Sequence, residues 1–357
     1  MKSNIIYILT AAIFTIVNLE AQWQFNSAIN REYSSNPFHS PDPVSSSVTI
    51  FDFALGRTNK SFDISYSGSY KNYSTLSGSD TYWQQAALYS DSDSISWGGM
   101  IENQINGINT DYLNYINGSA YFNILLEFSE IYWKIESDLN FMKYSKMREL
   151  DNINFSASLR GIKSFESKTT FILGTEVNYK NYLNALNSSG NEESSTILQI
   201  SLNPRISQSI WENWGIAVFH NQRIVLNSPA VNAVQYESGY GDESLYFDDP
   251  FSNRGFKSGI VLTGKLPADI TVKSGFNYSE LTFVSQPVYI SETTMNFDVL
   301  RRDIKQNYFI SVDWEISVGE NSTIDFITGY SFEKSTSNSY WFNYKNSSFS
   351  VGAQFYF

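Results

Sequence analysis

From Gln22 to the last residue, apolar and polar side chains alternate one by one through most of the chain. In one such stretch, Trp133 and Ile135 lie on either side of Lys134 and are followed by Glu136. A period of two is that of a β-strand with one apolar and one polar face, whereas amphipathic helices repeat every 3.6 residues. The alternation is clearest in 61–71, 131–141, 153–160, 196–206 and 324–333. The sequence therefore predicts an all-β chain of two-faced strands.

The connections between the alternating segments are short and long in turn. The short ones are 56–60, 90–94, 129–130, 165–168, 209–213, 266–268 and 319–322, and the long ones are 34–44, 75–79, 107–111, 145–150, 185–193, 227–253, 287–301 and 335–339. This sorting is typical of transmembrane barrels, which have short turns at one rim and long loops at the other, and a sandwich or propeller gives no reason for it. We predict an antiparallel up-and-down barrel of about sixteen strands, near the roughly 9–11 residues that a tilted membrane strand needs. Because 81–89, 95–104 and 214–225 alternate poorly, roughly fourteen to eighteen strands are compatible with the pattern.

Composition supports a membrane barrel. Aromatic residues make up 16% of the chain, yet its mean hydropathy is only −0.28. A barrel with an apolar outer face and a polar inner face averages to such a value, and its aromatic residues gather at the two bilayer interfaces. Trp133, Trp211 and Trp214 flank short turns and fit one such girdle, although a packing role is the alternative. No shift of composition marks a second domain.

Several function classes are excluded. The chain has no cysteine, which rules out disulfide scaffolds, thiolate metal sites and cysteine enzymes. Its net charge of −12 and the lack of a basic cluster argue against nucleic acid as a partner. The chain is too rich in apolar side chains to be disordered.

Residues 1–21 have the layout of a secretory signal peptide. Lys2 provides the positive start, an apolar segment runs from Ile5 to Val17, and a short polar stretch ends at Ala21. The apolar segment is too short for a comfortable transmembrane helix, although a buried helix or an anchor is the alternative. We expect cleavage after Ala21, so that residues 22–357 form the barrel.

The last strand resembles the terminal strand of Gram-negative outer-membrane β-barrel proteins. Phe349, Val351, Phe355 and Phe357 lie on one face, and the chain stops on an aromatic residue. The resemblance implies that these four residues form a barrel-insertion signal. It also implies localisation in the outer membrane of a Gram-negative bacterium with a Bacteroidota-like envelope, and the partners outer-membrane lipid and the barrel-assembly machinery. It reaches no functional family, and an edge strand of a secreted sandwich is the alternative.

The catalytic inventory is small. Only two histidines occur, His39 in a proline-rich segment and His220 in a poorly alternating strand, and neither lies in a nucleophile motif. His220 followed by Asn221 is faintly similar to barrel phospholipases, but their serine spacing is missing. The acidic segment 242–249 could bind a cation, although its spacing fits no ion-binding template and a solvated loop is the simpler interpretation. We predict no enzyme activity, no cofactor and no metal.

The polar faces of the strands predict the lumen. The lining residues are Lys134, Glu136, Asp138, Arg160, Glu176, Lys180, Arg205, Lys273, Asp313, Glu315 and Asp325. A mixed-charge wall around water suits passive diffusion of small hydrophilic solutes in the manner of a porin. Two alternatives remain open. The first is a non-conducting structural or assembly barrel with a periplasmic or envelope partner, whose lumen is plugged by paired charges and by loop 227–253. The second is an outer-membrane hydrolase that uses His220.

Overall fold

The structure is a computed structural model that describes residues 22–59, 61–75, 78–186, 192–227, 252–319 and 322–356. The predicted signal peptide, Phe357, the acidic segment 242–249 and most of loop 227–253 lie outside the described residues. No helix among the described residues is long and apolar enough to cross a membrane.

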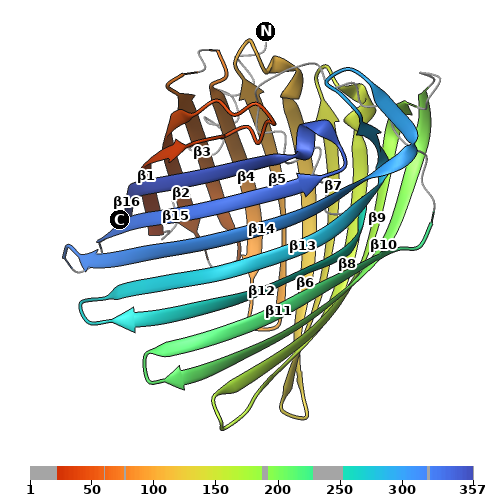
Figure 1. The fold of residues 1–357 in the computed structure, drawn as a ribbon. Coiled ribbons are helices and arrows are strands. Elements are labelled where there is room, and N and C mark those ends of the chain that lie inside the picture. The colour runs from red at the N-terminus through yellow and green to blue at the C-terminus, as the bar shows by residue number, and fades with distance from the viewer. Residues whose placement is uncertain are drawn as a thin grey trace.

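Sixteen strands form one closed antiparallel barrel, which confirms the predicted fold class and strand number. Each strand pairs with its neighbours in sequence, and β1 closes the ring on β16 (Figure 1). The strands are β1 (Gln22–Ser34), β2 (Ser46–Thr58), β3 (Asp63–Tyr73), β4 (Thr81–Asp91), β5 (Ile95–Asn106), β6 (Tyr115–Phe128), β7 (Ile131–Tyr144), β8 (Asn152–Ser164), β9 (Thr169–Leu186), β10 (Glu192–Trp211), β11 (Trp214–Val225), β12 (Asn253–Leu266), β13 (Ile270–Tyr289), β14 (Met295–Ser317), β15 (Thr323–Ser337) and β16 (Tyr344–Tyr356). Closure matters because it leaves no sheet edge with unpaired backbone groups.

The short connections are tight turns, and two of them are built from pairs of left-handed residues. Ser129 and Glu130 join β6 to β7 with φ values of 52° and 60°, and Ala268 and Asp269 have φ values of 64° and 56° at the β12–β13 turn. Two successive positive φ values are the geometry of a type I′ hairpin, whose twist matches that of the strands it joins. All the short turns lie at one end of the barrel, here called the short-turn rim. The other end is the long-loop rim.

The long-loop rim carries three short 3-10 helices, η1 (Asp111–Leu113), η2 (Arg148–Leu150) and η3 (Tyr340–Phe342). The prediction of a long loop over 287–301 is wrong. β13 continues to Tyr289 and β14 begins at Met295, so that the two strands form a long hairpin with only five residues at its tip. Pro287 lies at an irregularity of the β13–β14 pairing, where a missing backbone N–H is tolerated. The three segments with poor alternation are all regular strands: β4, β5 and β11.

Candidate functional site: the barrel lumen and its mouth

The cross-strand pairing divides the side chains into two faces, because directly paired residues of an antiparallel sheet point to the same side. One face is rich in large apolar residues that stay exposed in the isolated chain, among them Ile135, Leu139 and Val351. The other face is mostly Ser, Asn, Gln and charged residues. Tyr115 and Tyr144 of this second face belong to a cluster that also holds residues from the opposite side of the ring. The polar face is therefore the inner one.

All eleven predicted lining residues lie on this inner face. The pairing connects them around the ring through Lys134 with Arg160, Ser158 with Glu176, Glu176 with Ser201, Arg205 with Phe219, Thr263 with Lys273, Thr271 with Asp313, and Glu315 with Asp325. They are Lys134, Glu136 and Asp138 on β7, Arg160 on β8, Glu176 and Lys180 on β9, Arg205 on β10, Lys273 on β13, Asp313 and Glu315 on β14, and Asp325 on β15.

The structure brings four of these residues on β7 and β8 together. The Glu136 carboxylate lies 2.7 Å from Lys134 Nζ and 3.3 Å from Arg160 Nη2, and it also accepts a hydrogen bond from the Ser158 hydroxyl at 3.3 Å. Asp138 accepts a hydrogen bond from Ser156 instead of an ion pair. On the other side of the ring, Lys273 pairs with Asp313 at 3.5 Å. These groups are partly exposed, so their pairing fixes side-chain positions more than it stabilises the fold.

The sequence pattern did not predict a second group of inner charges, on β11 and β12. Arg223 on β11 donates hydrogen bonds to Asn221 and Asn253, and Lys257 on β12 lies within electrostatic range of Arg223, Lys305 and Glu333. The β11 pattern hid this group because Ala217 and Phe219 also face inward, which breaks the alternation. The polar residues Asn221 and Arg223 lie two positions apart, and this spacing was the one local sign that both face the lumen.

Two inner phenyl rings lie flat against glycines on the wall. A Cβ atom added at Gly259 would meet the Phe219 ring at 2.5 Å, and one added at Gly275 would meet the Phe309 ring at 2.6 Å. The missing side chains leave room for the rings to lie along β12 and β13 instead of projecting toward the axis. Glycine at these two positions therefore helps to set the free width of the lumen.

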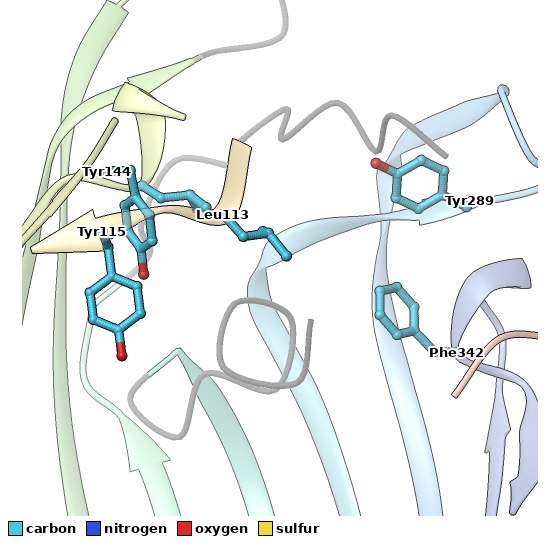
Figure 2. Close-up of a cluster of buried hydrophobic side chains, with 6 residues drawn as sticks. Leu113, Tyr115, Tyr144, Tyr289 and Phe342 are labelled. Atoms are coloured by element: carbon cyan, nitrogen blue, oxygen red, sulfur yellow. The ribbon is translucent and has the colours of Figure 1, made fainter. Parts of the chain in front are cut away.

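The long-loop rim is bridged by a hydrophobic cluster. Its buried members are Leu113, Tyr115, Tyr144, Leu150, Tyr289 and Phe342, and it includes the partly buried Tyr112, Met142, Met147, Met295, Tyr340 and Trp341. Figure 2 shows Leu113, Tyr115 and Tyr144 on one side, facing Tyr289 and Phe342 on the other. The first group comes from the β5–β8 part of the ring and the second from β13–β16, and in a ring of sixteen β6 lies opposite β14. The cluster therefore crosses the mouth of the barrel.

Neither histidine forms a recognisable catalytic site. His220 Nδ1 lies 2.8 Å from Ser258 Oγ on the neighbouring strand, a contact that sequence spacing could not reveal. Both residues face outward. The His220 ring also stacks on Phe256, with ring centroids 5.7 Å apart. A serine hydrolase also needs a group that orients the histidine and donors for the oxyanion, and no described residue is seen in either role. His39 stacks on Tyr344 with ring centroids 4.5 Å apart. Among the described residues no three His, Asp or Glu side chains are grouped to hold a metal ion.

The predicted terminal signal and girdle fall on the outer face. Phe349, Val351 and Phe355 point outward from β16, opposite Tyr33, Arg31 and Ser27 of β1. Trp133, Trp211 and Trp214 all lie at the short-turn rim, where the Trp214 ring covers Gly264 and the Trp133 ring covers Gly161. An outward ring over a strand glycine shields backbone that would otherwise be bare.

Comparison with known proteins shows likeness of fold without likeness of sequence. No protein-family model and no curated protein sequence matches the chain. Among solved structures, Acinetobacter baumannii OccAB1 superposes with a TM-score of 0.53 at 8% identity, with 95% of this chain and 96% of that one covered. Acinetobacter baumannii OccAB3 gives 0.54 at 6% identity over 95% and 100% of the chains. Pseudomonas aeruginosa OpdK, solved with vanillate, gives 0.52 at 6% identity over 94% and 98%. OccAB1 and OpdK are outer-membrane porins of Gram-negative bacteria.

Proposed function

We propose that this chain is an outer-membrane porin-like channel through which small hydrophilic solutes diffuse passively, without a cofactor. The observation that carries the proposal is the closed ring of sixteen strands whose inner face holds charges of both signs. A ring of eight strands is filled by its own side chains, whereas one of about sixteen strands encloses an aqueous lumen. The fold that the chain shares with OccAB1 and OpdK supports this function.

The chemistry of the wall sets the kind of solute. Both cations and carboxylates line the lumen, and several form pairs, such as Lys134 with Glu136 and Lys273 with Asp313. A paired, mixed-sign wall exerts only a weak net field on a passing ion, so we expect weak selectivity for charge. The net charge of −12 does not by itself imply a cation channel.

The proposed location is the outer membrane of a Gram-negative bacterium. The outward apolar face suits lipid, and the proposed route is export by cleavage of residues 1–21, followed by insertion by the barrel-assembly machinery, which would recognise Phe349, Val351, Phe355 and Phe357. The described part of the β16 strand supports this because its three aromatic and aliphatic members face outward.

Planar-bilayer recording of the full-length mature protein tests the channel. We expect discrete conductance steps. A known sixteen-stranded porin, measured in parallel, is the positive control. A complete absence of steps, with the control porin conducting, would refute the proposal.

The hydrophobic cluster across the mouth favours a second candidate, a non-conducting structural or assembly barrel. That function predicts a stoichiometric periplasmic or envelope protein that co-purifies with the barrel, and no conductance after the mouth is opened by mutation. The two candidates are therefore separable by experiment.

A further inference from the structure

The upper part of the β13–β14 hairpin is separated from the barrel wall by a break in its pairing. The wall ladder runs in register up to Thr282 opposite Arg302, lapses, and resumes as Pro287 opposite Leu300 and then Val288 opposite Asn296. The segment from Phe283 to Arg301, here called the cap hairpin, is thus a small hairpin whose base stays attached to β12, where Phe283 pairs with Asn253 and the Val284 N–H donates to the Ser252 oxygen at 2.9 Å. Consecutive residues Phe283, Val284 and Ser285 are all buried, so both faces of this stretch are covered by protein.

Arg301 fixes the base of the cap hairpin. Its side chain is completely buried and lies between two rings, with the guanidinium carbon 4.0 Å from the Phe283 centroid and 3.2 Å from that of Phe342. It forms a bidentate ion pair with the equally buried Asp303 and donates a hydrogen bond to Gln286 at 2.8 Å. A guanidinium stacked between rings and paired in a plane is held in one orientation. Through Phe342 of η3, Arg301 connects the cap hairpin to the β15–β16 connection.

Weaker polar contacts hold the tip. The Tyr340 hydroxyl lies 3.3 Å from Glu292 Oε1 and 3.2 Å from Asp42 Oδ2, and it has one proton to donate to either carboxylate. Trp341 Nε1 donates to the Glu292 carbonyl oxygen at 3.2 Å, and the Tyr289 N–H donates to Ser339 Oγ at 3.0 Å. The contacts of Tyr340 and Trp341 are exposed, so they are individually weak and readily replaced by water, whereas the bond from Tyr289 to Ser339 is buried.

Tyr289 and Met295 pair with each other next to the tip of the cap hairpin. Both belong to the cluster that reaches Leu113 and Tyr144 across the mouth. The cap hairpin therefore contacts groups on both sides of the opening. It is fixed at its base by one buried arginine, and at its tip by exposed hydrogen bonds of Tyr340 and Trp341 and by the buried bond from Tyr289 to Ser339.

We propose that the cap hairpin is a gate at the long-loop rim of the channel, and that Arg301 is the positioning residue that holds it closed. The inference rests on the proposed channel function. Opening swings the hairpin about the unpaired residues 285–286, moves Tyr289 away from the part of the cluster that holds Leu113, and admits solute to the polar lumen below.

Cross-linking tests the gate directly, since the chain contains no cysteine of its own. Glu292→Cys and Tyr340→Cys in the full mature chain are joined by a short bis-methanethiosulfonate reagent, and single-channel conductance is recorded before linking, after linking and after reduction. We expect linking to lower the open fraction by about 5- to 150-fold, the range usual for coupling between two states, and reduction to restore it. The two single-cysteine variants treated with the same reagent are the controls.

Removal of the latch gives the opposite perturbation. Arg301→Met keeps most of the packing between the rings but loses the ion pair, and we expect it to raise the open fraction. Arg302→Met is the matched control, because Arg302 is the next residue, faces outward and makes only an exposed pair with Glu280. A third variant, in which residues 287–300 are replaced by Asn-Gly, removes the gate without touching Arg301. Each barrel is compared in detergent before and after heating. A barrel that stays folded in detergent until it is heated has the correct fold.

The outcomes separate the two proposals. Equal conductance of the linked, reduced, Arg301→Met and shortened barrels would overturn the gate and leave the channel standing. No conductance in any variant, including the shortened barrel, would overturn the channel itself. Conductance that falls on linking and rises in the other two variants supports both.

Discussion

Substitution of Gly275 by alanine should narrow the lumen by displacing one phenyl ring. The new Cβ would lie 2.6 Å from Cε1 and Cζ of Phe309 and 2.8 Å from the backbone oxygen of Ile260. Real Cβ atoms do not tolerate such distances, so the Phe309 ring must move and the wall must also shift slightly at the Ile260 oxygen. Because Phe309 lies on the inner face, we expect the displaced ring to turn toward the barrel axis.

The magnitude follows from the two ways of relieving the clash. Holding the ring in place costs about 1–3 kcal/mol of overpacking. Releasing it gives up the burial of a half-buried phenyl group, which is about 1 kcal/mol when full burial is worth about 1.5–3 kcal/mol. The cheaper route is release, but the contact with the Ile260 oxygen remains after the ring has moved, so we expect a loss of at least roughly 1 kcal/mol in the free energy of unfolding together with a lower single-channel conductance.

Gly56→Ala is the matched control. Gly56 also faces inward, on β2, but nothing lies within 4 Å of the Cβ that would be added. That substitution should leave conductance unchanged and leave stability unchanged or slightly higher, since alanine has less backbone freedom to lose than glycine. The assays are guanidinium unfolding followed by tryptophan fluorescence, and planar-bilayer recording. The double variant Gly275→Ala with Phe309→Ala should recover the conductance. If Gly275→Ala behaves like Gly56→Ala in both assays, the lumen is not shaped by glycine-supported rings.

Four further outcomes are expected. Neutralising both cations beside Glu136, with Lys134→Gln and Arg160→Gln, should shift the reversal potential in a salt gradient toward cations, and an unchanged potential would place these groups away from the ion path. Burial, with a smaller contribution from nearby Asp151, raises the pKa of the Glu149 carboxyl above its ordinary value. Its ionised form therefore costs stability above the folded-state pKa, and that cost disappears as the pH falls through it. The hydrogen-exchange protection factors of η2, which are corrected for the intrinsic pH dependence of exchange, should therefore rise on mild acidification and lose this change in Glu149→Gln. Deletion of Phe357 should reduce the amount of barrel in the outer membrane severalfold without changing the conductance of the barrels that insert, and equal amounts would remove the insertion signal. His220→Ala should alter neither conductance nor lipid composition, and a loss of ester hydrolysis in that variant would revive the hydrolase alternative.

The closed barrel was predictable because its signal is local. Each strand has to present an apolar face outward and a polar face inward, so a two-residue period is written into every strand, and the short turns mark one rim. The eleven inner residues followed from the same period. Once Glu136 is assigned to one face, Lys134 and Asp138 must share it.

The prediction failed where packing replaces alternation. The cap hairpin is covered on both faces, as the buried consecutive residues Phe283, Val284 and Ser285 show, so a period of two does not continue into 287–301 and the sequence predicted a loop there. In the same way β11 places Phe219 on the polar face because Gly259 makes room for it on the next strand. A side chain whose place depends on a glycine forty residues away leaves no mark in its own neighbourhood.

The contacts proposed to control access to the lumen also join residues that are distant in the sequence. Leu113 and Phe342 are far apart in sequence and come from opposite parts of the ring, so neither periodicity nor turn chemistry brings them together. The pattern of the strands specifies the closed barrel, and this fold tolerates many sequences, as the likeness to OccAB1 at 8% identity illustrates. In the proposed channel, passage of solute would depend instead on the few residues at the mouth. Arg301 is the sharpest of them, because a fully buried guanidinium is retained only where its partners hold it in place, and loss of those partners costs about 3–5 kcal/mol. Selection on such a barrel should therefore act more strongly on Arg301, Asp303 and Phe342 than on any single charge of the wall.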